Sequence, residues 1–248
     1  MASATRWLKV LAVMFAFAPP SSFANEQMRL DPAPLNLRDV TSLQRGARNF
    51  VNYCLTCHSA EYMRYSRLTD LGLTEQEIKD NLLLTGAKYG ETMVVAMDKK
   101  DAKQWFEVAP PDLSVIARSR GADWLYTYLR SFYRDDSRST GWNNLLFHNV
   151  AMPHALYQLQ GVQALQVSKK EGEEGTEEGK TLVLEQAGQL SPRDYDIFVA
   201  DLVNYLVYMG EPAATTRTQV GIVVLFFMVG FFVLALLLKQ EYWKDVKK

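Results

Sequence analysis

The sequence predicts a mainly α-helical domain outside the cytoplasm, followed by a single C-terminal membrane-spanning helix. Three observations predict this architecture: a short apolar segment at the N-terminus, a longer uninterrupted one near the C-terminus, and apolar residues at helical spacing between them. The 248 residues are 48% hydrophobic and 22% charged, which excludes a disordered chain.

The first element is a secretory signal over residues 1–24. Arg6 and Lys9 precede an apolar stretch over residues 10–18, and the small residues Ser22 and Ala24 end the segment. A positive start, a short apolar stretch and small residues before the cut are typical of a cleaved signal. An uncleaved anchor is the alternative, but so short a stretch spans only about half of the hydrocarbon core.

Residues 25–216 are expected to form the exported domain. Its 20 Lys and Arg stand against 26 Asp and Glu, a net charge of −6, whereas the whole chain carries −1. A negative domain gives no indication of a nucleic-acid partner. An oxidising compartment permits a disulfide, but the spacing of the two cysteines argues against one.

That spacing is the motif Cys54-Leu55-Thr56-Cys57-His58, which predicts covalent attachment of one haem c. Two thiols three positions apart can add to the vinyl groups of a porphyrin. The histidine that follows is then carried under the porphyrin face to bind the iron.

Three other interpretations of the motif exist, and one of them, a chance match, is disfavoured because the motif uses both cysteines of the chain. A redox C-x-x-C pair needs no histidine after it and is typical of a βαβ context. A zinc site needs two further ligands, for which only His148 and His154 remain among the histidines. The export signal also supplies the compartment that haem attachment requires, so haem is the favoured reading.

Two predicted helices frame the domain. Residues 43–53 lead into the motif with apolar residues on one face, and a second helix starts at a capping Ser191 and ends at Gly210. Gly46 on the first helix lets its backbone approach the second, which carries Leu202 and Tyr205. This arrangement resembles the class I cytochrome c fold, so we expect a mainly α, class I cytochrome c-like haem domain.

Iron held by His58 alone could bind small molecules, whereas a second protein ligand makes it an electron carrier. Met152 precedes Pro153, which favours an extended backbone from which the thioether can point inward. Met209 fits the apolar stripe of the last helix, and Met63 lies too close to the attachment site. The downstream candidates are Met63, Met93, Met97, Met152, Met209, His148 and His154. Residue chemistry alone leaves the choice among them open.

The last element is a membrane anchor, predicted as a helix over residues 217–239. Residues 220–238 contain no charge, Pro, Ser or Thr, and their length matches the ~20 residues that cross a bilayer. Lysines follow the apolar stretch at positions 239, 244, 247 and 248, in the tail over residues 240–248 and just before it, whereas Arg217 is the only basic residue close before the stretch. This asymmetry places the tail in the cytoplasm and the haem domain in the periplasm. The short secretory signal favours the inner membrane of a bacterium.

Beyond the haem motif, several blocks are similar to the cytochrome c1 family, which provides the haem subunit of quinol–cytochrome c reductase, the bc1 complex. The resemblance covers essentially the whole mature chain, and its most specific block is Pro-Pro-Asp-Leu-Ser. The blocks are Arg45-Gly46, Cys54 to Ser59, Met63-Arg64-Tyr65, Ala109 to Ser114 with Arg118 and Arg120, and Ala151-Met152-Pro153.

The resemblance implies a role for several residues. It makes Met152 the distal iron ligand opposite His58, places Arg120 near a haem propionate and packs Pro111 at the haem edge. Trp124 stands where the family often has a tyrosine, which puts a hydrogen bond from that position in doubt but not packing against the haem. Residues 101–108 also lack the asparagine of relatives.

The resemblance further implies a function. One electron passes from a Rieske iron–sulfur protein to a soluble c-type cytochrome, inside a dimeric complex that also contains cytochrome b. The chain is then a redox subunit of an oxidoreductase without a catalytic site of its own. The alternatives are a stand-alone anchored cytochrome c that feeds a terminal oxidase, a gas sensor or enzyme with an open iron, and a haem-free assembly subunit.

Residues 169–180 are an acidic, glycine-rich tract that looks like an insertion. Its acids are Glu171, Glu173, Glu174, Glu177 and Glu178. A composition of this kind predicts a solvated, mobile loop. The second interpretation is a docking surface for a basic soluble cytochrome c, which would raise the encounter rate more than the affinity.

Overall fold

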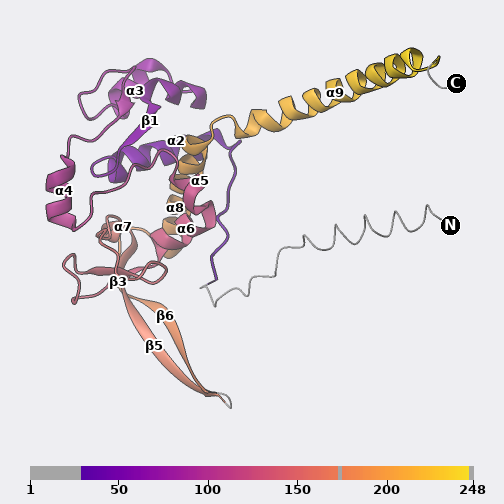
Figure 1. Ribbon diagram of the computed structural model, residues 1–248. Helices are drawn as coiled ribbons and strands as arrows, with labels where there is room; N and C mark the ends of the chain where they lie inside the picture. The colour runs from indigo at the N-terminus through magenta and orange to yellow at the C-terminus, as the bar shows by residue number, and fades with distance from the viewer. Residues whose placement is uncertain (1–28, 173–174, 246–248) are drawn as a thin grey trace.

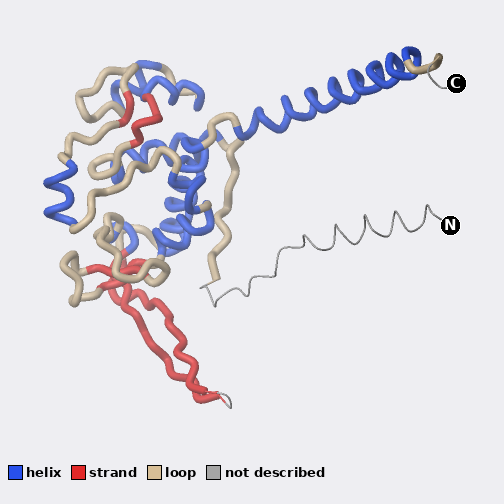
Figure 2. Tube along the Cα trace, in the orientation of Figure 1, coloured by secondary structure: helices blue, strands red, loops and turns tan. Residues whose placement is uncertain are grey.

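The computed structural model describes residues 29–172 and 175–245. The predicted signal lies outside that part of the chain, and so do Glu173 and Glu174. Figures 1 and 2 show a largely helical body from which a hairpin and one long C-terminal helix project in different directions. The predicted order, a mainly helical domain followed by a single long apolar helix, is confirmed.

The described helices are α2 (Val40–Asn49), α3 (Glu75–Asn81), α4 (Lys99–Phe106), α5 (Ile116–Arg120), α6 (Ala122–Arg130), α7 (Tyr157–Gln160), α8 (Pro192–Gly210) and α9 (Ala214–Tyr242). A π-helix, η1 (Phe50–Cys54), and a 3-10 helix, η2 (Tyr65–Leu71), complete the helical segments of the described residues. The strands form antiparallel pairs: β1 (Ala60–Arg64) with β2 (Thr92–Met93), β3 (Phe132–Arg134) with β4 (Trp142–Asn144), and β5 (Gly161–Gly172) with β6 (Gly175–Ala187).

The centre of the domain is the crossing of α2 and α8. A Cβ atom built on Gly46 would lie 2.1 Å from the backbone oxygen of Asp201 and 2.6 Å from Cβ of Tyr205. Only a residue without a side chain permits this approach. Leu202 on the same helix is fully buried. The predicted glycine crossing is therefore confirmed.

A polar network is buried beside this crossing. Asp201 accepts a hydrogen bond from Ser42 Oγ at 2.6 Å and from Arg45 Nε at 2.5 Å. Asn204 donates to Ser42 Oγ at 3.0 Å. Because buried polar groups are costly without partners, the network favours one register of the two helices.

The predicted boundaries of both framing helices hold to within a few residues. Asp39 caps α2 by accepting from Ser42 N, and Ser191 caps α8 by accepting from Asp194 N, with Pro192 in the first position. The first predicted helix, 43–53, is an α-helix as far as Asn49 and a π-helix from Phe50 to Cys54. Cys54 is the last residue of this π-helix and directly precedes the turn over residues 55–57.

A second, smaller hydrophobic cluster lies below α6. It contains Phe132, Trp142 and Val150, with Tyr128 and Met152 packed against it. His154 is buried in the same place, with its ring stacked on Phe132 at 4.8 Å. The predicted methionine loop therefore rests on its own small core.

The interpretation of residues 169–180 as a loop is wrong. The backbone continues in antiparallel register through this tract, from Gly161 paired with Ala187 to Gly172 paired with Gly175. Figure 1 shows the hairpin reaching far from the helical body. Valines at positions 162, 167 and 183 favour strands on both sides of the acidic residues. An acidic composition predicts solvation, and the strands of a hairpin can be solvated on both faces.

The C-terminal element is α9, a helix of 29 residues. It is long and apolar enough to cross a membrane, and none of its apolar window is buried against the rest of the protein. Figure 1 shows it leaving the body as an isolated rod. An exposed apolar helix of this length is expected to be covered by lipid.

Candidate haem site

The haem motif sits at the end of η1. The amide N–H groups of Cys57 and His58 both donate to the carbonyl of Cys54, at 3.0 and 2.8 Å, and so close a turn after the helix. Both cysteines are free thiols and half-buried. Burial raises the pKa of the Cys54 thiol to about 12 and also raises the pKa of Cys57. Neutral thioethers suit these surroundings better than thiolates do.

His58 is oriented by the Pro-Pro-Asp-Leu-Ser segment. Its Nδ1 lies 2.8 Å from the carbonyl oxygen of Pro111. A carbonyl only accepts, so Nδ1 carries the proton and Nε2 presents its lone pair away from the backbone. Burial lowers the pKa of His58, which the hydrogen bond to Pro111 and the charge of Asp112 partly oppose. A neutral imidazole with a fixed tautomer is the form that binds iron.

Further hydrogen bonds join this segment to the chain after the motif. Leu113 N donates to Ser59 O at 2.8 Å, and Glu61 N donates to the Asp112 carboxylate at 2.8 Å. Tyr62 N donates to Ser114 Oγ at 3.1 Å. The conformation of residues 111–114 therefore determines where the His58 ring lies, and Pro111 acts through its carbonyl as well as through its ring.

Met152 lies in a loop, half-buried, and its sulfur has a defined partner. The Tyr128 hydroxyl donates to Met152 Sδ at 3.4 Å. Burial raises the pKa of Tyr128, so the hydroxyl keeps its proton at neutral pH. A thioether sulfur has two lone pairs, and this contact leaves one for a metal.

Two buried asparagines hold the methionine loop. Asn144 Oδ1 accepts from the amides of Leu146 and Phe147, both at 3.0 Å, and its Nδ2 donates to Tyr128 O at 2.8 Å. Asn143 Oδ1 accepts from Asn149 N at 2.9 Å. Sequence reasoning missed Tyr128, Asn143 and Asn144, and the Asn-Asn pair shortly before Met152 was the available signal.

Arg120 and Trp124 lie together on the α5–α6 side of the site. The Arg120 guanidinium stands over the Trp124 ring at 5.0 Å and over the Phe147 ring at 5.9 Å. Trp124 in turn stacks on Tyr128, with ring centroids 4.8 Å apart. Arg120 makes no ion pair with any described residue, so its donors are available to an anion such as a propionate.

The structure thus groups the predicted site residues in two sets. His58 is placed by Pro111 beside Cys54 and Cys57, while Met152 is linked through Tyr128 to Trp124 and Arg120. The donor set suits a c-type haem: two thiols, one neutral imidazole, one available thioether and one unpaired cation. No three His, Cys, Asp or Glu side chains gather within the described residues in a way that could hold a bare metal ion.

Most of the other ligand candidates lie in surroundings of a different kind, whereas Met97, like Met152, is half-buried in a loop. Met63, Met93 and Met209 are buried in the main core, and Met93 Sδ accepts from Tyr205 Oη at 3.9 Å. His148 is exposed. His154 is packed between Phe132 and Trp142, its Nε2 has no described partner, and burial lowers its pKa to about 4.

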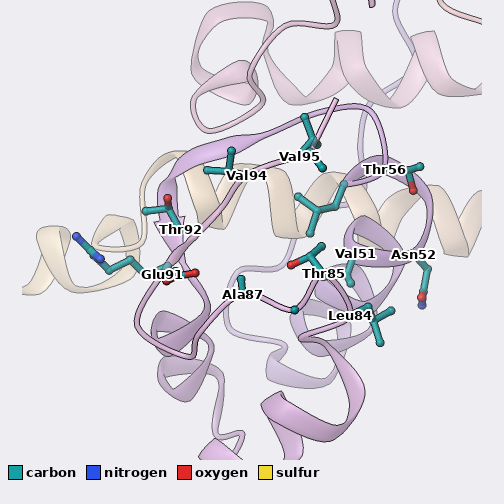
Figure 3. A pocket seen from close by; sticks show the side chains of 14 residues that line it. Val51, Asn52, Thr56, Leu84, Thr85, Ala87, Glu91, Thr92, Val94 and Val95 are labelled. Atoms are coloured by element: carbon teal, nitrogen blue, oxygen red, sulfur yellow. The ribbon is translucent and has the colours of Figure 1, made fainter. Parts of the chain in front are cut away.

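A cavity of about 960 Å³ borders the attachment loop. Figure 3 shows Val51 and Asn52 on one side of it and Glu91 and Thr92 on the other. Leu55 and Thr56, the residues between the two cysteines, also line it, but none of the seven predicted site residues does. The cavity therefore lies beside the loop rather than between the proposed iron ligands.

Comparison with known proteins gives consistent results over nearly the full length. The Cytochrome C1 family model matches residues 33–246. The chain is 48% identical to cytochrome c1 of Allochromatium vinosum, over 96% of this chain and 98% of that protein. It is 51% identical to a protein of Nitrosomonas europaea named ammonia monooxygenase gamma subunit, over 97% and 99%. Cytochrome c1 of Rhodospirillum rubrum is 25% identical, over 84% and 83%.

Proposed function

The chain belongs to the cytochrome c1 family, and on that premise we propose that it is the membrane-anchored electron-transfer subunit of a quinol–cytochrome c reductase. The proposal rests on one observation: hydrogen bonds orient the side chains of both proposed iron ligands. His58 is held in the neutral, iron-binding tautomer by Pro111, and the Met152 thioether is held by Tyr128. A six-coordinate iron transfers electrons without a substrate site, so the chain needs no catalytic residue of its own.

We infer that the chain carries one haem c, bound through Cys54 and Cys57, with His58 and Met152 as the axial ligands. Bound haem iron supplies a reversible one-electron couple. Pro111 fixes the imidazole, and Tyr128 withdraws electron density from the thioether by hydrogen bonding. Met opposite His is the ligand pair typical of high potential. Arg120, which stands on Trp124, is placed to bind a propionate.

The partners follow from the family. A quinol–cytochrome c reductase also contains cytochrome b and a Rieske iron–sulfur protein, and we propose that the haem receives its electron from the Rieske protein. We further propose a soluble c-type cytochrome as acceptor and a dimeric complex. The net charge of −6 on residues 25–216 favours a basic acceptor.

For localisation we propose a single-pass protein of a bacterial inner membrane, with its haem domain in the periplasm. The exposed apolar helix α9 supports the anchor. The lysines that follow residue 238, against Arg217 on the other side, support a cytoplasmic tail. Protease treatment of sealed spheroplasts should digest the haem domain and spare the tail; the reverse pattern would contradict this orientation.

Copurification tests the assignment to a complex. After mild detergent extraction, the chain should copurify with cytochrome b and with a Rieske protein. A lone anchored cytochrome would instead support the alternative of direct donation to a terminal oxidase. Copurification with a monooxygenase would support the name carried by the Nitrosomonas europaea relative.

Replacement of Met152 tests the proposed ligand pair. Met152→Ala should abolish the far-red absorption band of a methionine–ferric iron bond and admit carbon monoxide to the reduced iron. The potential should fall by on the order of 0.1 V, a fraction of the ~0.8 V that axial ligands span. Met97→Ala, in a half-buried loop, is the matched control and should leave both properties unchanged. An unchanged spectrum in Met152→Ala would remove Met152 from the iron.

A further inference from the structure

A second cavity, of about 590 Å³, lies where the domain joins α9. Its walls come from residues 37–43, from η2, from Tyr208 near the end of α8, and from the first residues of α9. None of the predicted haem-site residues lines it. The electron-transfer function therefore leaves this cavity without a role.

The position of the cavity along α9 indicates that it lies in the layer of lipid headgroups when the helix spans a membrane. Thr215 and Thr216 line it, and the uninterrupted apolar stretch of α9 begins at Val220. Four or five helical residues cover about 6–8 Å. The polar layer on each side of the hydrocarbon core is roughly 5–7 Å thick. The mouth of the cavity therefore opens into the headgroup layer when α9 spans the bilayer.

The charges that line the cavity favour an anion. Arg38, Arg67 and one carboxylate, Asp70, line the cavity, and Arg67 Nη2 lies 2.8 Å from Asp70 Oδ2. The Tyr208 hydroxyl donates to the same carboxylate at 3.4 Å. Arg38 makes no ion pair with any described residue. One guanidinium is thus in excess, and a guanidinium matches two phosphate oxygens at once.

Leucine and valine side chains form an apolar part of the cavity wall, and two segments of the wall are held in place by hydrogen bonds. Leu43 and Leu71 form buried parts of the wall, and Val40 is exposed at its rim. Gln44 Nε2 donates to Leu71 O at 2.7 Å, which joins η2 to α2. Asn204 Nδ2 donates to Asn36 O at 2.9 Å, which joins the segment before α2 to α8. The walls from η2 and from the segment before α2 are thus tied to the same helical core, so this part of the site does not have to form around its ligand.

We propose that this cavity binds the headgroup of one anionic glycerophospholipid. The phosphate pairs with Arg38 and Arg67, and the glycerol region rests against the apolar wall. The acyl chains then run down beside α9 into the bilayer. The ligand is a lipid rather than a free phosphate because the cavity joins a cationic part to an apolar one that leads to the membrane-spanning helix. The bound lipid would fix the tilt of the haem domain on its anchor.

Titration of the delipidated full-length haem protein in detergent tests the proposal. Native mass spectrometry counts the bound lipids at each concentration and gives an apparent Kd. The probes are dioctanoyl phosphatidylglycerol, dioctanoyl phosphatidylcholine and inorganic phosphate. We expect one phosphatidylglycerol per chain, bound at least about 5-fold more tightly than phosphatidylcholine. Millimolar phosphate should not displace it; equal binding of the two lipids, or displacement by phosphate, would overturn the proposal.

Charge variants give effects of opposite sign, which a folding defect cannot produce. The double variant Arg38→Gln/Arg67→Gln should weaken phosphatidylglycerol binding about 25-fold, from about 5-fold per lost cation. Asp70→Asn, which removes the only carboxylate that lines the described cavity, should tighten it about 5-fold. An unchanged Kd in either variant contradicts the proposal.

The matched control is Arg48→Gln/Arg193→Gln. It removes the same charge from two exposed positions that do not line the cavity, and its Kd should stay within twofold of wild type. Equal weakening in this control would mean that the whole domain, not the cavity, attracts the lipid. The titration is repeated on the complex with cytochrome b. If lipid binding there no longer depends on Arg38 and Arg67, another subunit covers the cavity and the proposal fails.

Discussion

Replacing Gly46 with alanine should destabilise the helix crossing that supports the haem motif. The new Cβ would lie 2.1 Å from Asp201 O and 2.9 Å from Asp201 C, both backbone atoms that no rotamer change can move. Ordinary contact begins near 3.4 Å, so α2 and α8 must separate by roughly 1.3 Å. The same movement would stretch the Arg45–Asp201 contact, now 2.5 Å, beyond hydrogen-bonding distance.

The terms in the free energy of unfolding can be compared. Overpacking costs about 1–3 kcal/mol, and two backbones in contact put this site at the upper end. Loss of the half-exposed Arg45–Asp201 pair costs about 1 kcal/mol after allowance for solvent. Alanine returns about 1 kcal/mol through its higher helix propensity. The net loss is about 3 kcal/mol, which lowers Tm by roughly 6–12 °C in a domain of this size.

Calorimetry of the full-length haem protein in detergent measures this change, and the haem absorbance per chain measures attachment. Gly90→Ala is the control, since a Cβ there meets nothing within 4 Å and its Tm should stay within about 2 °C of wild type. A Gly46→Ala protein that melted as the wild type does, with full haem content, would refute the reasoning. Such a result would mean that the two helices can move apart without losing stability, despite the buried hydrogen bonds between them.

The remaining predictions concern the site and the hairpin. Tyr128→Phe removes the donor to Met152 Sδ, so the sulfur donates more strongly to ferric iron and the potential, measured by redox titration, should fall. Stability should drop by about 1 kcal/mol in the same variant, and an unchanged potential would separate Tyr128 from the iron ligand. Arg120→Gln should lower the potential by roughly 40 mV, from about 1 kcal/mol of lost charge interaction, while Arg118→Gln, also exposed, should not change it. Replacing residues 166–181 with a two-residue turn should leave Tm within about 2 °C, because this part of the hairpin extends beyond the body, and a large loss of stability would contradict that. Stopped-flow reduction of a basic cytochrome c should slow several-fold in that variant at low salt only, if the acidic tract attracts the acceptor.

Local signals in the sequence were sufficient for the main helices. Ser191, Pro192 and Gly210 mark the ends of α8 because capping and backbone preference act within a few residues. The spacing of apolar residues then identified which faces are buried, and Gly46 indicated the crossing. The π-helix at Phe50 was not predictable, since it covers only five residues, too few for a change in the spacing of apolar residues to be recognised.

The hairpin was not predicted because the acidic, glycine-rich composition of residues 169–180 was given more weight than the strand-forming residues on both sides of it. Five acids and several glycines between residues 171 and 179 indicate solvation, yet solvated strands are stable once a neighbouring strand pairs with them. The strand-forming residues at positions 162–167 and 181–184 lie outside the acidic tract and were not weighed with it.

In the candidate site, the residues of the haem motif are close together in the sequence, whereas the residues that hold the proposed ligands in place are far from them. Cys54, Cys57 and His58 lie within five positions of one motif, so spacing alone predicts a role for them. The contact from His58 to Pro111 spans 53 positions. The Asn-Asn pair is visible in the sequence, but the backbone amides from which these asparagines accept are known only from the structure. The family resemblance, rather than spacing, favoured Met152 over the other methionines.

One helix supports both proposed iron ligands. Towards its C-terminal end, α8 crosses α2 at Gly46, and α2 leads directly into the motif that carries His58. Near its N-terminal end, the Tyr195 hydroxyl donates to Leu129 O at 2.8 Å and Asp196 pairs with Arg130 at 2.6 Å, which fixes α6 and with it Tyr128. Both proposed ligands are therefore linked to the same helix, His58 through α2 and Met152 through α6 and Tyr128. A change that bends α8 between Asp196 and Asp201 should disturb iron ligation from both sides, although no residue in that interval belongs to the haem site.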